Sequence, residues 1–594
     1  MSVQSNQDRP IENILAGLVF MAFMAAAGGN WLIGNLASLL ARRQLLGVSL
    51  GQALVALRNM PGHWDDPRRA WSEPAASALP GPVLYWISAV VVMVVLLAVG
   101  VAVLLRVGRR HEPVDQRRRV GVETQARLAR TCDLRRLLTT RPQAGRFVLA
   151  RWSRRRSLAT EGEVYRGRRG VRGAVGVFGP SQSGKTTGLI AGVDAWKGPA
   201  IVSSVKTDLM RATLARRSDA GEVKVFDPAG ISGMDTATWT PLRAAGRLPG
   251  AVAAAQMLAR SGARGETNHQ FWQGQAEQLL AGMLWTAANT EGHSMRNVVK
   301  WVLELDRPGD AGGGTLAPLV RLLTDHANPA VSGAACEVQG WLHGQWKTDE
   351  RTTSNVYATA RNAVWPWADP NVAASADGCD ITLDWLLKDS NTLYLCAPLG
   401  DETRIGVVFA VLLHDLILQA FDRANRTETI DPRLLILLDE AANTPLPKLP
   451  EWASTVTGAG IQLVTVWQSK AQLDQLYGRQ AENVLTNDRS KLVYPSGLSD
   501  MATIEYISAL VGTEHVRSDL DESRWGGRAE SPPSRSPSTA VPFLPASVLR
   551  RMQVGDALLF HGELPAAWIR GRSIRNRNRR PAEGASNQQA SPQG

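Results

Sequence analysis

Hydrophobic residues are concentrated in two uncharged runs near the N-terminus and in shorter runs thereafter. Residues 13–40 and 83–105 contain no charged side chain. Each run is longer than the roughly 20 residues that an α-helix needs to cross the hydrocarbon core of a bilayer. We therefore predict two transmembrane helices, at about 14–34 and 83–105, within a membrane anchor formed by residues 1–110.

The charged residues that flank these runs indicate an orientation. A cleaved signal peptide is the alternative for the first run, but Arg9 stands between Asp8 and Glu12 rather than in a basic cluster. Arginines follow the second run immediately, which favours the cytoplasmic side from residue 106 onward. We expect a multi-pass protein of the cell (inner) membrane with both termini in the cytoplasm. The loop at 41–82 would then lie outside the cytoplasm, although it contains five arginines.

From about residue 146, short apolar runs alternate with stretches of helical periodicity. This alternation is typical of a parallel α/β sheet. Residues 246–390 are instead rich in Ala, Leu and Trp at helical spacing. We predict an α/β domain, residues 146–245 and 391–570, that is interrupted by an inserted all-α domain at 246–390. The predicted strands are 174–178, 199–204, 224–228, 392–396, 434–438, 462–467, 491–494, 556–560 and 567–570.

Positive charge is concentrated directly after the second apolar run. Residues 106–172 contain 20 arginines, no lysine and six acidic residues, a net charge of +14, whereas the whole chain carries +12. Residues 111–145 are therefore predicted to be a basic connector. Two compatible interpretations are contact with an anionic membrane surface and contact with nucleic acid phosphates. Polar composition predicts a disordered insertion at 519–540 and a disordered basic tail at 571–594.

One glycine-rich stretch has the most specific chemistry in the sequence. It follows the pattern G-x-x-x-x-G-K-[ST] of a phosphate-binding loop (P-loop), between a predicted strand and a predicted helix. In such a loop, backbone N–H groups surround the phosphates of a nucleotide, the lysine reaches the β- and γ-phosphates, and the next hydroxyl binds Mg²⁺. We expect ATP and Mg²⁺ as ligands, with Lys185 also catalytic and Thr186 a metal ligand. The predicted nucleotide-binding residues are Gly179, Pro180, Ser181, Gln182, Ser183, Gly184, Lys185, Thr186 and Thr187.

An acidic pair at the end of another predicted strand supplies the groups that hydrolysis needs. The apolar residues 434–438 are followed by Asp439 and Glu440. At the carboxyl edge of a sheet, Asp439 is placed to hold Mg²⁺ and Glu440 to act as general base toward water. Gln468, at the end of the next strand, is a catalytic candidate that would sense the γ-phosphate or position water.

Further short motifs accompany these two. They are SSVKTDL at 203–209, FDP at 226–228, WTPL at 239–242, DEA at 439–441, QS at 468–469 and SGLSD at 496–500. In this order the motifs resemble those of the type IV coupling proteins, the conjugative DNA-transfer ATPases of type IV secretion systems. The resemblance extends over the two apolar runs and residues 146–570. It implies a RecA-like P-loop NTPase domain with an inserted all-α domain, assembled as a homo-hexamer.

The resemblance also implies a function and partners. The expected protein is a membrane-anchored ATPase that delivers DNA, as a relaxase-bound single strand, into a type IV secretion channel. The expected partners are DNA, a relaxase or other secreted protein, the channel components and the membrane. Its contacts with DNA would be electrostatic and independent of sequence. In a hexameric ring a neighbouring subunit would donate an arginine to the site, and Arg361, Arg479 and Arg489 are candidates. Three alternatives stay open: a coupling ATPase for protein cargo, an FtsK-like or HerA-like DNA pump, and a cargo-docking receptor that does not hydrolyse ATP.

Overall fold

The structure, a computed structural model, divides into two compact units, Met1–Thr124 and Gln125–Gly594. Each unit has a hydrophobic core of its own. The described residues are 9–108, 125–162, 164–165, 168–204, 207–262, 270–308, 314–398, 400–427, 429–444, 446–517 and 538–570.

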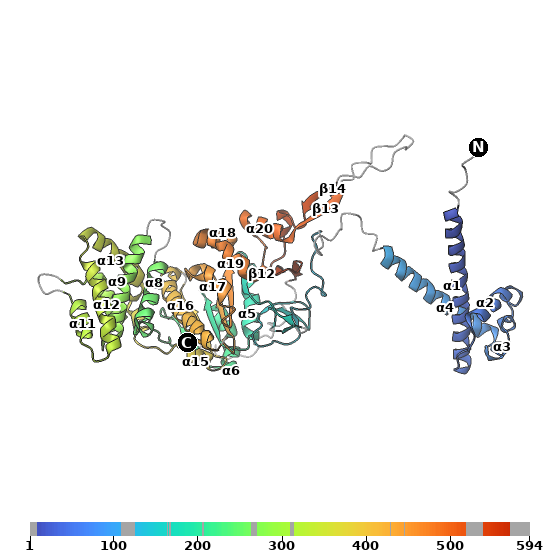
Figure 1. The fold of residues 1–594 in the computed structure, drawn as a ribbon, viewed down its shortest axis with the longest axis horizontal. Coiled ribbons are helices and arrows are strands. Elements are labelled where there is room, and N and C mark those ends of the chain that lie inside the picture. The colour runs from blue at the N-terminus through green and yellow to red at the C-terminus, as the bar shows by residue number, and fades with distance from the viewer. Residues whose placement is uncertain are drawn as a thin grey trace, which may run out of the picture. The chain divides into compact units, whose positions relative to one another are not determined.

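The first unit consists of two long helices joined by a small folded segment. The long helices are α1 (Arg9–Arg42) and α4 (Pro82–Gly108) (Figure 1). Between them lie α2 (Leu50–Asn59), α3 (Ala75–Ala78) and two 3₁₀ turns (Met60–Gly62 and Pro67–Ala70). A buried hydrogen-bond chain runs from Trp71 Nε1 to the Tyr85 hydroxyl (3.3 Å) and from that hydroxyl to Asn30 Oδ1 (3.0 Å). The segment at 41–82 is therefore packed against both long helices.

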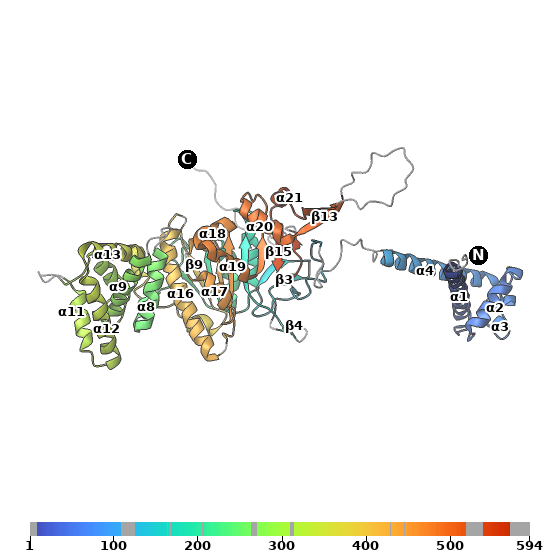
Figure 2. The ribbon, with the colours of Figure 1, turned by 45° about the horizontal axis from the view of Figure 1, so that its top comes forward.

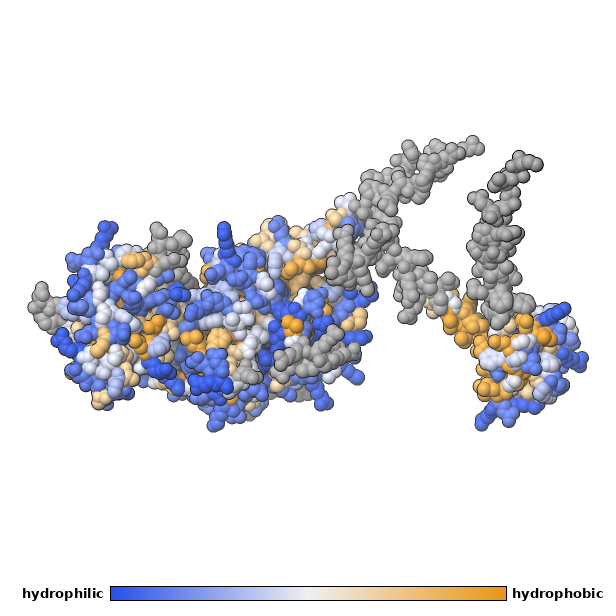
Figure 3. All heavy atoms as spheres, viewed as in Figure 1, coloured by the Kyte–Doolittle hydropathy of each residue, from blue (hydrophilic) through white to orange (hydrophobic). Residues whose placement is uncertain are grey.

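Helix α4 has the length and composition of a transmembrane helix. Its residues Pro82–Ala102 have a mean hydropathy of 2.6 with 17% burial, and Figure 3 shows apolar side chains of this unit at the surface, in orange. Among the described residues, Arg404–Thr427 passes the same test but is 72% buried, which is typical of a core helix in a globular unit. The predicted span at 14–34 lies on α1, and its side chains before residue 26 lie outside the described residues.

The second unit is built on a nine-stranded sheet with the order β16-β15-β12-β6-β11-β10-β7-β9-β8. The seven strands from β12 to β8 are parallel, and β15 pairs antiparallel with both β12 and β16. Every residue of β6, β9, β10 and β11 is buried, as expected for parallel strands covered on both faces. The strands are β6 (Ala174–Phe178), β7 (Ala200–Ser204), β8 (Val223–Phe226), β9 (Thr392–Cys396), β10 (Leu434–Leu438), β11 (Ile461–Trp467), β12 (Asp488–Val493), β15 (Ala557–His561) and β16 (Ala567–Ile569). The α/β class and all nine predicted strands are confirmed, with ends shifted by a few residues.

Helices that follow β8 in the chain and precede β9 form the inserted domain. They are α7 (Leu242–Ala245), α8 (Leu248–Gly262), α9 (Gln270–Ala288), α10 (Met295–Leu303), α11 (Leu316–Thr324), α12 (Pro329–Trp346), α13 (Glu350–Val364), α14 (Pro370–Ala374) and α15 (Leu383–Lys388). Figures 1 and 2 show α8, α9 and α11–α13 grouped together on the side of α16 that faces away from the sheet. The remaining helices are α5 (Lys185–Ala195), α6 (Asp208–Ala220), α16 (Glu402–Thr427), α17 (Leu449–Thr455), α18 (Lys470–Tyr477), α19 (Ala481–Asn487), α20 (Met501–Val511) and α21 (Ala546–Arg550).

The predicted basic connector at 111–145 ends earlier than expected. Ala126 N donates to Thr513 O (3.0 Å) and Ala129 N to Ala566 O (2.7 Å), and Leu134 and Leu137 are fully buried. The chain then forms a three-stranded antiparallel sheet from β1 (Leu138–Thr139), β2 (Val148–Arg151) and β3 (Ser157–Ala159), followed by the short pair β4 (Val164–Tyr165) and β5 (Arg168–Arg169). The prediction was wrong from about residue 126 because the arginine count hid the apolar residues that dock this segment. Residues 111–124 lie outside the described residues.

A β-hairpin borders the insertion predicted at 519–540. Its strands β13 (Thr513–Arg517) and β14 (Ser538–Pro542) pair antiparallel. Residues 538–540 are therefore part of a strand, in contrast to the prediction, and residues 519–537 lie outside the described residues. The predicted tail at 571–594 also lies outside them.

Candidate nucleotide-binding site

The P-loop connects β6 to α5 at the carboxyl edge of the parallel strands. Gly179 (φ +154°) and Gly184 (φ +102°) have backbone angles that favour glycine. A Cβ atom at Gly179 would lie 2.6 Å from Tyr494 O, and one at Gly184 would lie 3.0 Å from Gly555 Cα. Gln182 also has a positive φ of 62°, which is uncommon for a residue with a side chain. The loop therefore holds a tightly curled backbone between its neighbours, as phosphate binding requires.

Lys185 is the first residue of α5, and its side chain returns across the loop. Its Nζ donates to the carbonyl oxygens of Gly179 and Pro180, the second at 3.0 Å. Burial lowers the pKa of Lys185, while the negative charges of Asp439 and Glu440 act in the opposite direction. The ammonium group is therefore held inside the loop, with the acidic pair close enough to influence it.

The remaining loop residues fit a phosphate ligand. The Ser183 hydroxyl is buried and has no hydrogen-bond partner within the described part of the chain. Ser181, Gln182, Thr186 and Thr187 are exposed. Gly184 precedes α5 without a side-chain cap, so the N–H groups of the first helical turn are available to an anion.

The acidic pair lies two strands away from the P-loop strand. Asp439 N donates to Ser203 O on β7 (2.9 Å), which fixes the backbone where β10 ends. Glu440 adopts a left-handed conformation with φ 58°, a strained geometry that is common at functional sites. Asn443 Nδ2 donates to Glu440 Oε2 (3.0 Å) and orients the carboxylate. Asn443 was missed in the sequence, although its position three residues after the acidic pair could have suggested it.

Gln468 lies between the P-loop and the acidic pair. Strand β11 separates β6 from β10, and its last residue Trp467 pairs with Phe178. Gly179 N donates to Trp467 O (3.1 Å), so Gln468 begins beside the P-loop. Its backbone N–H donates to Gln472 Oε1 (3.0 Å) and its side chain is exposed. The sheet order thus places all the sequence-predicted site residues along one edge.

The three candidate arginines differ in their surroundings. Arg361 on α13 and Arg479 in the 3₁₀ turn Gly478–Gln480 are exposed. Arg489 is at the opposite end of β12 from the P-loop, where its guanidinium pairs with Glu563 (2.9 Å). Because this ion pair is internal to the subunit, Arg489 is the least suitable of the three to serve a neighbour.

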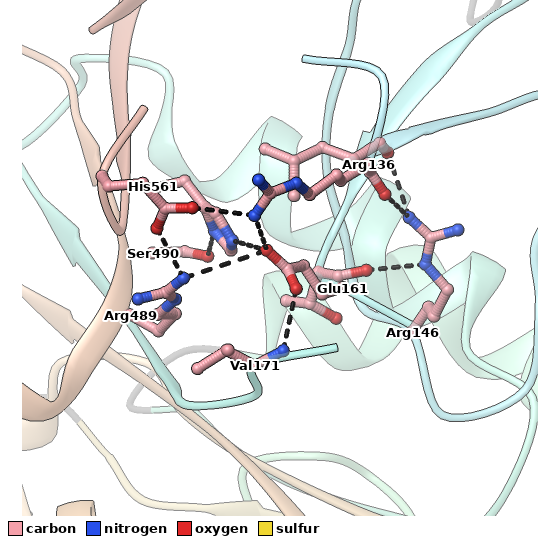
Figure 4. Close-up of polar contacts among 10 residues, drawn as sticks. Arg136, Arg146, Glu161, Val171, Arg489, Ser490 and His561 are labelled. Carbon is pink, nitrogen blue, oxygen red and sulfur yellow. Dashed lines mark hydrogen bonds and ion pairs between the residues drawn. The ribbon is translucent and has the colours of Figure 1, made fainter. Parts of the chain in front are cut away.

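A second polar cluster occupies the opposite edge of the sheet (Figure 4). The Ser490 hydroxyl and His561 Nδ1 lie 2.8 Å apart, and His561 Nε2 lies 3.1 Å from Glu161 Oε1. Glu161 also accepts from Val171 N (2.8 Å). This order of groups is that of a hydrolytic triad, but Ser490, His561 and Glu161 are 1%, 2% and 4% exposed. This burial closes the three groups to substrate. Their hydrogen bonds instead join the segment around residue 161 to the sheet.

Comparison with solved structures gives the same architecture. The bacterial conjugative coupling protein TrwBdeltaN70, in a trigonal form with sulphate, matches with a TM-score of 0.53 at 16% identity over 75% of this chain and 93% of that chain. Its unbound monoclinic form matches with a TM-score of 0.54 at 17% identity over 75% and 92%. No curated protein sequence matches the chain. At this identity the structural match shows the fold, a RecA-like P-loop domain with an inserted helical domain.

The family model for type IV secretory system conjugative DNA transfer matches residues 135–566. The chain belongs to this family, the type IV coupling proteins. Membership implies DNA and secretion-system components as partners, and together with the apolar helix α4 it indicates association with a membrane.

Proposed function

We propose that this protein is a membrane-anchored ATPase that couples ATP hydrolysis to the delivery of DNA into a type IV secretion channel. The observation that carries the proposal is the position of Lys185 and of the carboxylates of Asp439 and Glu440 at one edge of the sheet, with only β11 between their strands. Structures of TrwB with a non-hydrolysable ATP analogue and a non-hydrolysable GTP analogue support a nucleoside triphosphate as substrate.

Each site residue has its own role in ATP hydrolysis. Loop residues 179–187 bind the phosphates, and Lys185 neutralises charge on the β- and γ-phosphates. Thr186 and Asp439 would hold Mg²⁺, which when bound neutralises phosphate charge. Glu440, oriented by Asn443, accepts a proton from the attacking water, and Gln468 positions that water.

We further propose a membrane topology, a ring assembly and a cargo. Both termini lie in the cytoplasm, with α1 and α4 crossing the membrane and residues 41–82 outside. Six copies form a ring in which Arg361 or Arg479 of one subunit reaches the site of the next. The cargo is single-stranded DNA with a relaxase at its end, and the helical domain at 246–390 receives it.

Substitution of the P-loop lysine tests the proposal. In the detergent-solubilised full-length protein, Lys185→Ala should lower DNA-stimulated ATP hydrolysis at least about 100-fold, because a preorganised cation for the transferring phosphate is lost. The same variant should not support DNA transfer between cells. Lys300→Ala, at an exposed lysine on α10, is the matched control. Normal DNA transfer by Lys185→Ala would overturn the proposal.

A salt titration separates DNA cargo from protein cargo. Contacts with phosphates release counterions, so DNA affinity should fall steeply and linearly on a logarithmic salt scale, with similar slopes for unrelated sequences. Absence of DNA binding at low salt would favour the protein-cargo alternative.

A further inference from the structure

A cavity of about 560 Å³ opens next to the turn that precedes β15. Its walls come from the end of α21, the turn before β15 and the edge strand β16; α21 and β15 are labelled in Figure 2. The lining side chains include Arg551, Gln553, Asp556, Trp568 and Arg570. A cavity of this size lies within the range of small-molecule sites.

The turn before β15 touches the P-loop directly. Gly555 N donates to Ser183 O (3.0 Å), and an added Cβ at Gly184 would lie 3.0 Å from Gly555 Cα. Gln553 and Asp556, on either side of Gly555, line the cavity. The cavity therefore begins within two residues of the backbone that contacts the phosphate-binding loop.

The order of strands gives the direction in which a bound nucleotide extends. The acidic pair follows β10, on one side of the P-loop strand β6, whereas β12 and β15 lie on the other side. Hydrolysis requires the terminal phosphate to face Asp439 and Glu440. The other end of the triphosphate then points toward β12 and β15, where the cavity lies.

The walls of the cavity suit a nucleobase. Trp568 is 39% exposed, between the buried Ala567 and Ile569 on β16. Its Nε1 donates to Asp556 Oδ2 (3.1 Å), which fixes the indole, and the Arg570 guanidinium lies 4.6 Å from the ring centroid. Flat aromatic and guanidinium surfaces stack on bases without regard to sequence.

We propose that this cavity is the nucleoside pocket of the site, with the base stacking on the pair formed by Trp568 and Arg570. The inference rests on the proposed function, because it extends the ATP site at the P-loop. Arg551 and Arg570 outnumber the single carboxylate of Asp556, so the cavity has a net positive charge that favours an anionic ligand such as a nucleotide. Because stacking dominates, adenine and guanine nucleotides are both accepted.

Calorimetric binding of Mg·ATP and of inorganic tripolyphosphate tests the inference. The full-length protein is used in a Glu440→Gln background, which prevents turnover. Trp568→Ala should weaken ATP binding about ten-fold, the loss expected for one stacked base, and leave tripolyphosphate binding unchanged. Trp568→Phe should recover most of the loss. Trp365→Ala, which removes a 53% exposed tryptophan from the helical domain, is the matched control.

The outcomes distinguish the two proposals. Unchanged ATP binding by Trp568→Ala, or an equal loss of ATP and tripolyphosphate, would overturn the nucleoside pocket and leave the ATPase intact. Failure of Lys185→Ala to weaken tripolyphosphate binding would overturn the ATP site itself. GTP binding more than about ten-fold weaker than ATP binding would contradict recognition by stacking.

Discussion

The two ends of strand β12 lie in two polar clusters, one exposed to solvent and one buried. At the carboxyl edge, Val493 pairs with Phe178 and Tyr494 N donates to Phe178 O (2.8 Å), immediately beside the P-loop. At the other edge, Arg489 and Ser490 enter the cluster with His561 and Glu161. Each end combines serine, cationic and carboxylate side chains that come from distant parts of the chain.

The two clusters differ in burial and in hydrogen bonding. In the cluster around His561, Glu161 accepts from Val171 N and contacts the imidazole, and its side chain is almost inaccessible. At the P-loop edge, the side chains of Thr186, Thr187 and Gln468 are exposed. The same residue types therefore stabilise the fold where their partners are internal, and form a binding site where the surface leaves them open to a ligand.

The largest expected effect is at the open edge. Glu440→Gln should lower ATP turnover about 10²- to 10⁴-fold, because the general base is lost, while nucleotide affinity stays within a few-fold of wild type. Turnover and calorimetric binding, measured on the same preparation, check this. If the variant hydrolyses ATP at the wild-type rate, a residue other than Glu440 is the general base.

Substitutions in the buried cluster around His561 should change the stability of the fold rather than catalysis. Glu161→Ala should lower the free energy of unfolding by about 3–5 kcal/mol, because it leaves the buried His561 and the neighbouring arginines without their carboxylate. Glu563→Ala removes an exposed partner of the same arginines and should cost about 1 kcal/mol or less. Denaturant unfolding of the full-length protein measures both, and equal losses would contradict the assigned difference in burial.

Asn443 offers a smaller test at the open edge. Asn443→Ala removes the amide that orients Glu440, so turnover should fall about ten-fold, a loss of about one hydrogen bond. Asn443→Asp keeps the shape but places a second carboxylate beside Glu440, and should impair turnover further. Unfolding midpoints near wild type are the control. If Asn443→Ala turns over normally, the asparagine does not position the base.

The smallest expected effect is the pH dependence of the closed cluster. Burial lowers the pKa of His561, although its bond to Glu161 favours the protonated ring. Below pH 6.5, the ordinary pKa of histidine, the unfolded chain gains a proton that the folded chain does not, so stability is lost as the pH falls. His561→Gln should therefore lose less stability than wild type between pH 7 and pH 5. A parallel decline in both proteins would contradict this sign.

Sequence reasoning was most successful where local pattern is enough. The spacing of Gly179, Gly184 and Lys185 requires a strand, a tight turn and a helix that are contiguous in the chain, and the apolar run before Asp439 requires a buried strand. The same reasoning missed the docking of residues 126–145, because a few apolar residues among many arginines give no periodic signal.

The sequence by itself determined the α/β class, the P-loop and the acidic pair, because each depends on residues close together in the chain. Only the tertiary structure decided which distant groups meet. Strand order brings Glu440 within reach of Lys185, places Gly555 against Ser183, and buries Ser490 and His561 beside Glu161. The physical reason is that pairing between strands joins residues hundreds of positions apart, and no short-range pattern records which strands become neighbours.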